Sequence, residues 1–194
     1  MKARLLAAML LPACICMQSC TPSYAKEGAP ENTSKECLDI SFRFQRGGIA
    51  SSQYAIWIED ETGRLVRTLY VTSFTAKGGY AYRKDAVSTW VRKAKPAEMP
   101  ADGIDALTGA TPRNGTVNYT WDGTDDKGNP VPKGTYTVFV EGTLYWENRI
   151  VYSGKVNWGS QTQQSVPITS RRYGTSPTNK DMITDLRFFH ARKK

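Results

Sequence analysis

The feature that most constrains the fold of this chain is a strict alternation of apolar and polar residues that begins at Leu38. Leu38, Ile40, Phe42 and Phe44 are apolar, and a polar residue follows each of them. Successive side chains of a β-strand point to opposite faces, so the pattern predicts a strand with one buried and one solvated face. Such a strand is stable only within a sheet whose apolar face covers a core.

The same pattern recurs in short segments that Gly, Pro, Asn and Asp residues separate. Two β-rich runs, residues 54–59 and 64–71, predict a hairpin in which Gly63 supplies the positive φ of the turn. Further strands are expected over 117–121, 135–146, 150–158 and 182–190. Short strands with such turns predict an all-β fold, an immunoglobulin-like or fibronectin III-like antiparallel β-sandwich.

Residues 72–116 interrupt this rhythm and are expected to be an insertion. Within it, apolar residues at helical spacing follow Asp85, which is a good helix-capping residue. One short helix is therefore predicted from Asp85 to Ala94, where two prolines follow. Residues 101–115 are then expected to form a loop.

The N-terminus has the pattern of an export signal. A charged start, an apolar run from Leu5 to Met17 and small residues further on predict a signal peptide over residues 1–25. A second interpretation is cleavage before Cys20 and lipidation of its thiol, which would anchor the protein to a membrane. Both interpretations place the protein in the periplasm or another extracytoplasmic compartment. Residues 26–36 are expected to be a flexible leader, and 37–194 a single β-sandwich domain.

Charge and composition limit the function classes. The formal net charge is +8, but the positive residues are dispersed, and an exported protein rarely meets nucleic acid, so no nucleic-acid partner is expected. Three of the four cysteines precede the leader, which leaves Cys37 as a small core residue without a disulfide partner. His190 is the only histidine, so a Ser-His-Asp triad or a histidine metal cluster has little material. No catalytic residue and no metal site is predicted.

A second signature runs from Trp121 to Tyr136, where Trp-Asp-Gly precedes a Gly-rich turn and the pattern Pro-x-Gly-x-Tyr. Trp121 and Tyr136 are expected to cover one end of the core, with Val138 and Val140 on the same face as Tyr136. The segment resembles the immunoglobulin-like module of the flagellar hook-capping protein and of many secreted bacterial proteins. This resemblance implies a fold and no function.

Three acidic residues within this signature, Asp122, Asp125 and Asp126, suggest a calcium loop. The EF-hand spacing fails, because Thr124 stands where a second acidic ligand belongs and Lys127 where the glycine should be. We interpret the segment as a polar hairpin turn.

The segment Asp-Ala-Leu-Thr-Gly-Ala-Thr, residues 105–111, resembles the site at which bacteria attach FMN through a phosphoester to a threonine hydroxyl. That acceptor site reads Asp, two variable residues, Ser or Thr, then Gly-Ala-Thr. The resemblance implies that the acceptor is Thr111 and that the site also contains Asp105, Thr108, Gly109 and Ala110. It further implies an electron carrier, with a flavin transferase and a membrane redox subunit as partners, and not an enzyme with its own substrate.

Three features, in this order behind an export signal, identify a family: the hairpin, the Gly-Ala-Thr segment and the Trp-Asp-Gly turn. They resemble the predicted periplasmic proteins of domain-of-unknown-function family 2271, over roughly Leu38 to Val156. Membership implies association with flavin-transfer systems and brings no established activity.

The acceptor segment departs from the flavin-carrying subunits of sodium-pumping NADH:quinone oxidoreductases. Those continue with an apolar residue and a second hydroxyl residue, whereas Pro112 and Arg113 follow here, and Pro112 biases Thr111 towards extended conformations. An inert loop with an Asx turn and non-covalent ligand binding therefore stay open as alternatives. Candidates for stacking on a flavin ring are Trp90, Tyr82 and Trp146, and candidates for pairing with its phosphate are Arg113 and Arg92.

A hypothesis from a different class is a cofactor-free periplasmic immunoglobulin-like binding or assembly module. Such a module would hold another envelope protein through a sheet edge or a loop. It predicts a colourless protein with a stable protein partner.

Overall fold

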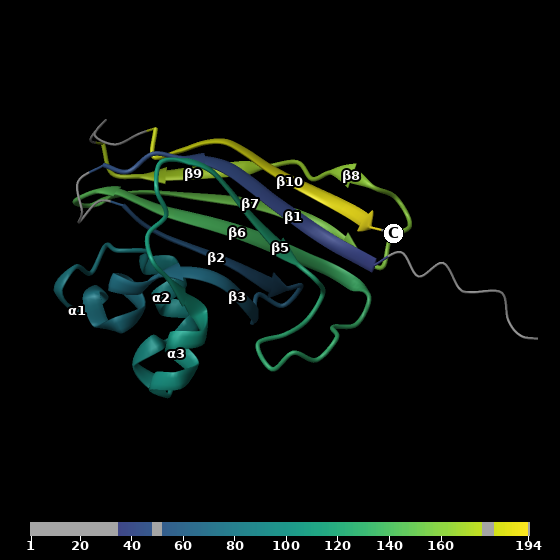
Figure 1. Cartoon of the computed structure of the whole chain (residues 1–194), viewed down its shortest axis with the longest axis horizontal. Helices are drawn as coiled ribbons and strands as arrows, with labels where there is room; N and C mark the ends of the chain where they lie inside the picture. Colours follow the sequence, from purple (N-terminus) through teal and green to yellow (C-terminus); the bar gives the residue numbers. More distant parts are fainter. Residues whose placement is uncertain (1–34, 48–51, 176–180, 194) are drawn as a thin grey trace, which may run out of the picture. The chain divides into compact units, whose positions relative to one another are not determined.

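Two β-sheets pack face to face in the computed structural model, which describes residues 35–47, 52–175 and 181–193 (Figure 1). One sheet has four strands in the order β5-β1-β10-β8, and the other has six in the order β4-β3-β2-β6-β7-β9. Neighbouring strands are antiparallel, except that β4 runs parallel to β3. The predicted β-sandwich is confirmed.

The strands are β1 (Lys35–Phe44), β2 (Gln53–Asp60), β3 (Leu65–Thr72), β4 (Thr108–Gly109), β5 (Gly115–Trp121), β6 (Gly134–Tyr145), β7 (Asn148–Trp158), β8 (Gln164–Ser165), β9 (Thr169–Tyr173) and β10 (Ile183–Lys193). Between β3 and β4 the chain forms the helical segments η2 (Thr75–Gly79), α1 (Tyr80–Tyr82), α2 (Ser88–Ala94), η3 (Pro96–Glu98) and α3 (Ala101–Leu107). No helix in the described part of the chain is long and apolar enough to cross a membrane.

The core between the two sheets follows from the alternation of the sequence. The apolar residues of β1 are fully buried there, and Tyr136, Val138 and Val140 of β6 face them from the other sheet. Trp121 closes one end of this core, because its ring lies 5.2 Å from that of Tyr136 and 4.4 Å from that of Trp158. The predicted roles of Trp121 and Tyr136 are thus confirmed.

A second core lies on the outer face of the six-stranded sheet, beneath the helical insertion (Figure 1). Trp57 projects from β2 into this core and stacks on Phe139 at 5.0 Å, while Val87 and Trp90 come from the insertion. β2 is therefore buried on both faces, which is why its sequence is almost continuously apolar.

The insertion contains more helix than the single short helix expected. Helix α2 begins at Ser88 and not at Asp85. The backbone amides of Thr89 and Trp90 at its start donate to the Glu141 carboxylate of the underlying strand β6, and not to a preceding side chain. Asp85 instead accepts hydrogen bonds from Arg83 and from the Glu147 amide. The capping group comes from the sheet, so local sequence could not locate the helix start.

The N-terminal part of the domain begins slightly earlier than expected. β1 starts at Lys35, so the last two residues of the expected leader belong to the strand, and the Glu36 carboxylate bonds to His190 at 2.6 Å. The expected signal peptide and the lipidation candidate Cys20 lie outside the described residues. Cys37 is a buried residue of β1, as expected.

His190 is a fully buried residue of β10, and both of its ring nitrogens meet acceptors. Nε2 faces the Glu36 carboxylate, and Nδ1 lies 3.1 Å from the carbonyl oxygen of Thr162. The only histidine therefore ties β1 and the segment after β7 to β10.

Candidate functional site

The acceptor-like segment crosses from the helical insertion to the four-stranded sheet. Asp105 lies in α3, Thr108 and Gly109 form β4, and residues 110–114 lead without regular structure to β5. The expectation of a loop over 101–115 is therefore wrong for its first part. Ile104 and Leu107 explain the helix, because both pack against the second core.

Tyr70 of β3 fixes the backbone of this segment. Its hydroxyl lies 3.3 Å from the carbonyl oxygen of Gly109 and 3.1 Å from that of Ala110, to which it donates. A Cβ atom at position 109 would lie 2.6 Å from the Tyr70 ring, so only glycine fits beneath this ring. The glycine of the motif thus has a packing role in the fold.

Tyr70 packs in one aromatic cluster with the buried Tyr54 and the half-buried Tyr119. The hydroxyl oxygens of Tyr54 and Tyr119 are 2.6 Å apart, and the rings of Tyr54 and Tyr70 stack at 4.7 Å. Burial raises the pKa of all three hydroxyls above the ordinary value. The cluster is therefore neutral, and its hydroxyls remain hydrogen-bond donors at any physiological pH.

The two polar residues at the start of the motif interact locally. The Asp105 carboxylate forms an exposed ion pair with Lys77 at 2.7 Å, and the Thr108 hydroxyl donates to the Asp105 carbonyl at 3.2 Å. An exposed pair of this kind contributes little to stability. The described contacts of Asp105 are therefore different from the backbone-bonding Asx turn that its position suggested.

Thr111 is half-buried and lies two residues beyond β4. No hydrogen bond to its hydroxyl occurs within the described ranges. Pro112 is also half-buried, whereas Arg113 is exposed. The segment therefore carries a half-buried threonine, with the exposed cation Arg113 two residues away.

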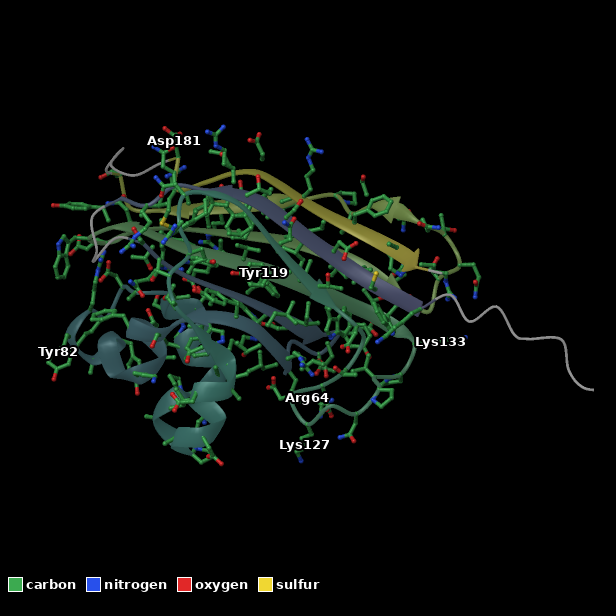
Figure 2. The ribbon with its side chains drawn as sticks, viewed as in Figure 1. Arg64, Tyr82, Tyr119, Lys127, Lys133 and Asp181 are labelled. Carbon is green, nitrogen blue, oxygen red and sulfur yellow. The ribbon has the colours of Figure 1, made fainter. Side chains whose placement is uncertain are left out.

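The structure separates the aromatic candidates. Trp90 is only 1% exposed, and its indole nitrogen donates to the Thr68 hydroxyl, so it cannot stack on a ligand: that expectation is wrong. Its helical spacing indicated a buried face, and the sheet covers it. Tyr82 projects outward from α1 (Figure 2), and Trp146 is exposed in the turn between β6 and β7. Arg92, a candidate for the phosphate, is exposed on α2.

Phe74 is an exposed aromatic residue that the sequence analysis missed. It follows β3 by two residues, just as Thr111 follows β4, and these two strands are paired at Val71–Thr108 and Thr72–Gly109. An apolar residue directly after a predicted strand is a weak signal that could have pointed to it.

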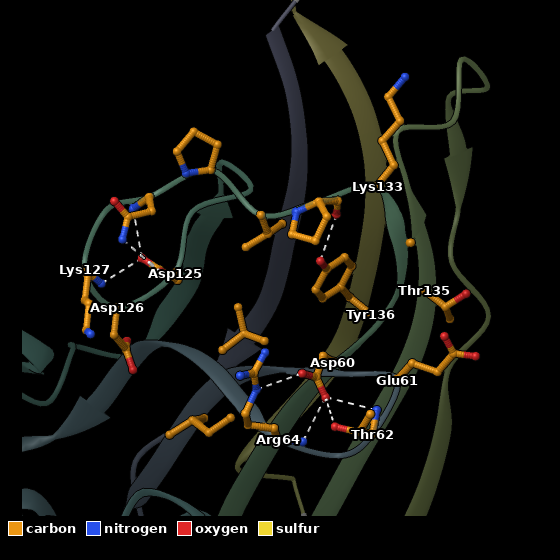
Figure 3. A pocket seen from close by; sticks show the side chains of 17 residues that line it. Asp60, Glu61, Thr62, Arg64, Asp125, Asp126, Lys127, Lys133, Thr135 and Tyr136 are labelled. Atoms are coloured by element: carbon orange, nitrogen blue, oxygen red, sulfur yellow. Dashed lines mark hydrogen bonds and ion pairs between the residues drawn. The ribbon is translucent and has the colours of Figure 1, made fainter.

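A cavity of about 670 Å³ lies away from the acceptor segment, between two turns (Figure 3). Two of its carboxylates stabilise their own turns. Asp60 accepts from the Thr62 and Arg64 amides, and Asp125 accepts from the Lys127 and Asn129 amides. The hydrogen bond from the Thr62 hydroxyl to Asp60, together with these amide bonds, holds the pKa of both aspartates below the ordinary value. The aspartates of the Trp-Asp-Gly signature form a polar turn, and Asp126 additionally accepts from the Thr68 amide.

A smaller cavity of about 260 Å³ adjoins the beginning of the motif. Its lining includes Ala106 and Leu107 of α3, Leu69 of β3 and Tyr119 of β5. It is a groove between the helical insertion and the edge of the four-stranded sheet. Its walls are partly apolar and partly polar, and they include Arg67.

Replacing Tyr70 with phenylalanine should loosen the acceptor segment without unfolding the protein. The substitution removes one hydroxyl that donates to two carbonyls, so the free energy of unfolding should fall by about 1 kcal/mol. Amide hydrogen exchange of residues 108–111 should accelerate. Tyr145→Phe is the control, because this tyrosine is exposed and no described hydrogen bond joins it to residues 108–111. Unchanged exchange over 108–111 would show that Tyr70 does not hold it.

Comparisons with known proteins identify the family of this chain. No curated protein matches the chain. Two crystal structures of truncated FlgD from Helicobacter pylori, one of them from strain 26695, are similar at 18% sequence identity. Their TM-scores are 0.31 and 0.32; the likeness covers 84% and 79% of this chain, and 86% and 82% of the FlgD chains. The family described as "Predicted periplasmic protein (DUF2271)" matches residues 37–175, and the chain therefore belongs to domain-of-unknown-function family 2271.

Proposed function

We propose that this protein is an exported carrier of FMN, attached through a phosphoester to Thr111, that passes electrons between envelope partners. The observation that carries the proposal is the Thr111 hydroxyl itself. It lies in an acceptor-like sequence, is half-buried on a segment without regular structure, and bonds to none of the residues that the structure describes. The match to a predicted periplasmic family supports the compartment in which such attachment would occur.

The residues around Thr111 suit an acceptor. Ala110 has a minimal side chain and is exposed, so it leaves room for a transferring enzyme. The bonds from Tyr70 to the Gly109 and Ala110 carbonyls hold the approach to Thr111 in one conformation. An acceptor that is ordered before the reaction loses less entropy when the enzyme binds it.

The attachment reaction requires FAD as the donor and a flavin transferase as the catalyst. The hydroxyl oxygen of Thr111 attacks the phosphorus on the FMN side of the FAD pyrophosphate. A new P–O bond to threonine forms, the P–O bond to the AMP half breaks, and AMP leaves. The hydroxyl proton passes to a base of the transferase. No electrons are exchanged in this step.

The surroundings of Thr111 offer groups for both ends of a bound FMN. Arg113 supplies a positive charge two residues from the phosphoester. The exposed ring of Phe74 lies at the same end of the paired strands β3 and β4, and provides a flat apolar face for the ring system. The bound FMN would supply the redox chemistry. The protein's own residues would hold and orient it.

Intact-mass measurement tests the attachment directly. The full chain, co-expressed with a periplasmic flavin transferase, should gain the mass of FMN less one water, and Thr111→Ala should abolish the gain. Thr116→Ala is the matched control, since this exposed threonine of β5 lies outside the motif. Absence of the adduct on the wild-type chain, or its retention in Thr111→Ala, would refute the proposal.

The edge of the six-stranded sheet supports a second candidate function, a cofactor-free binding or assembly module. β9 pairs with β7 on one side only, and most of its side chains are exposed. An exposed edge can accept a strand from another protein. A colourless protein that co-purifies with an envelope partner, and loses it when Ser170 is replaced by proline, would favour this function.

A further inference from the structure

Exposed aromatic side chains gather at one end of the sandwich. Among the described residues, the strongly exposed large hydrophobic ones are Phe74 (48% exposed), Tyr82 (88%), Tyr145 (42%), Trp146 (54%) and Phe189 (41%). Phe74 and Tyr82 lie in the segment that follows β3, and Tyr145 and Trp146 lie where the chain passes from β6 to β7. Strand pairing places these positions at one end of the sheet. Val71, near the end of β3, pairs with Ala55 near the start of β2, and Gln53 at the start of β2 pairs with Thr143 near the end of β6. We call this surface the aromatic end.

Direct contacts join the insertion to the β6–β7 turn at the aromatic end. The Arg83 guanidinium lies 4.8 Å from the ring centre of Trp146, and the Glu147 amide donates to Asp85 at 2.9 Å. The Arg83 amide in turn bonds to Gly79, which packs on the Phe74 ring. Tyr82 precedes Arg83 and projects outward (Figure 2). The exposed aromatic side chains of the insertion and of the β6–β7 turn therefore belong to one continuous surface.

Positive charge surrounds the aromatic end. Among the residues that the structure describes, its exposed cations are Arg46, Lys84, Arg113, Arg171 and Arg172. Arg46 and Arg113 lie two residues from the paired residues Phe44 and Gly115, and the Arg46 amide donates to Asn114. The Phe44 ring packs on Tyr54 near the start of β2, which places both arginines at this end of the sandwich. The exposed acids are Glu147 and Asp181, whereas Asp85, Asp105 and Glu141 are paired with cations. The surface is therefore basic as well as aromatic.

Arg83 adds an unsatisfied donor beneath this surface. Its side chain is only 3% exposed, and two of its nitrogens donate to Asp85 at 3.3 and 3.2 Å. The third nitrogen, Nη1, is buried and has no hydrogen-bond partner. An unsatisfied buried donor of a charged group is costly, and such groups in native structures usually meet a partner. The exposed Trp146 ring lies over the same guanidinium.

We propose that the aromatic end docks onto a membrane that carries anionic phospholipids. Trp and Tyr rings favour the headgroup region of a bilayer, and Lys and Arg are attracted to its negative surface. When Trp146 inserts into the headgroup region, it uncovers Arg83 Nη1, which then donates to a phosphate oxygen of a lipid.

The docking proposal is independent of the proposed flavin. Thr111 lies between β4 and Gly115, at the same end of the sandwich. Docking would therefore bring an attached FMN next to a membrane redox partner. Membrane binding and flavin attachment are nevertheless measured separately, so either can fail alone.

Intrinsic fluorescence offers a specific readout, because Trp146 is the exposed one of the five tryptophans. The full chain carrying Cys20→Ser, which precludes lipidation, is mixed with phosphatidylcholine vesicles that contain or lack phosphatidylglycerol. With phosphatidylglycerol at low salt, we expect co-sedimentation, a blue shift of emission and quenching by brominated lipid. Trp146→Phe should abolish the shift and the quenching. Neutral vesicles and high salt should abolish binding.

Matched substitutions separate the aromatic end from the rest of the surface. Tyr82→Ser with Trp146→Ser should weaken binding to anionic vesicles at least ten-fold, while Phe189→Ser leaves it unchanged. Lys84→Glu with Arg172→Glu should weaken it by more than ten-fold, because each cation near a membrane contributes about five-fold. The charge control, Lys155→Glu with Arg187→Glu, should have little effect.

Three results would overturn the docking proposal. The first is equal binding to neutral and anionic vesicles. The second is equal loss in the aromatic-end variants and in their controls. The third is no vesicle binding by a wild-type chain that melts cooperatively, which would leave an acidic protein as the partner of this surface.

Discussion

Replacing Glu141 with alanine is expected to lower the free energy of unfolding by about 3–5 kcal/mol. The Glu141 side chain is fully buried, and its carboxylate accepts hydrogen bonds from the Thr89 and Trp90 amides at 3.0 Å and from Arg149 at 3.1 Å. The substitution would leave a largely buried cation and two amides at the start of α2 without their acceptor. Uncompensated buried groups of this kind are among the most destabilising changes known.

Glu98→Ala is the matched control for Glu141→Ala. Glu98 is exposed, and its ion pair with Lys95 spans 3.4 Å, so its loss should cost less than about 0.5 kcal/mol. Urea unfolding followed by circular dichroism and tryptophan fluorescence measures both variants. Similar midpoints for Glu141→Ala and Glu98→Ala would show that Glu141 does not hold the insertion onto the sheet.

The same carboxylate should make stability depend on pH. Burial raises the pKa of Glu141 above its ordinary value of 4.5, and the amide donors and Arg149 oppose this shift. The folded state then binds the proton more tightly than the unfolded state. Stability from this group is therefore complete below pH 4.5 and falls as the pH rises through the folded pKa. Glu141→Gln should flatten this slope, which unfolding curves at a series of pH values would reveal.

The sandwich could be predicted because its information is local. Alternation in β1 and β6 assigned the buried faces correctly, and the Trp-Asp-Gly turn predicted the packing of Trp121 on Tyr136. The short strands β8 and β9 escaped prediction, since their residues are almost all exposed and show no apolar alternation.

The insertion could not be predicted because distant residues determine it. The acceptor for the amides of α2 is Glu141, about 50 positions later in the chain, and β4 is a strand only because β3 pairs with it. Periodicity identified Trp90 as one member of an apolar stripe. The periodicity of the sequence does not indicate whether a sheet or a ligand covers that stripe.

The candidate site was predictable only in part, for the same reason. The sequence placed Thr111 outside the regular strands, and the structure has it half-buried, two residues beyond β4. The anchoring by Tyr70 depends on a residue 39 positions before Gly109, and no local pattern contains it. Phe74 lies beside the motif only because β4 pairs with the end of β3.

A second large effect on the free energy of unfolding is expected at Gly123, in the Trp-Asp-Gly turn. Gly123→Ala is expected to lower the free energy of unfolding by about 2–5 kcal/mol, from two sources. Gly123 has a φ of +76°, a conformation that costs about 1–2 kcal/mol for a residue with a Cβ atom. The new Cβ would also overlap the indole of Trp158, and overpacking of this kind costs about 1–3 kcal/mol.

Gly128→Ala separates these two sources. Gly128 has a φ of +81°, so its backbone cost should match that of Gly123, but a Cβ atom there would meet nothing within 4 Å. The difference between the two variants therefore measures the contact with Trp158. That contact matters because Trp158 packs on Trp121 at 4.4 Å, so displacing it disturbs the closed end of the core. We expect Gly123→Ala to melt well below Gly128→Ala, with a change in near-ultraviolet circular dichroism confined to Gly123→Ala. Equal melting temperatures would mean that Gly123 is needed only for the backbone conformation of its turn. They would also mean that the Trp158 ring can move away from a new Cβ atom without destabilising the core.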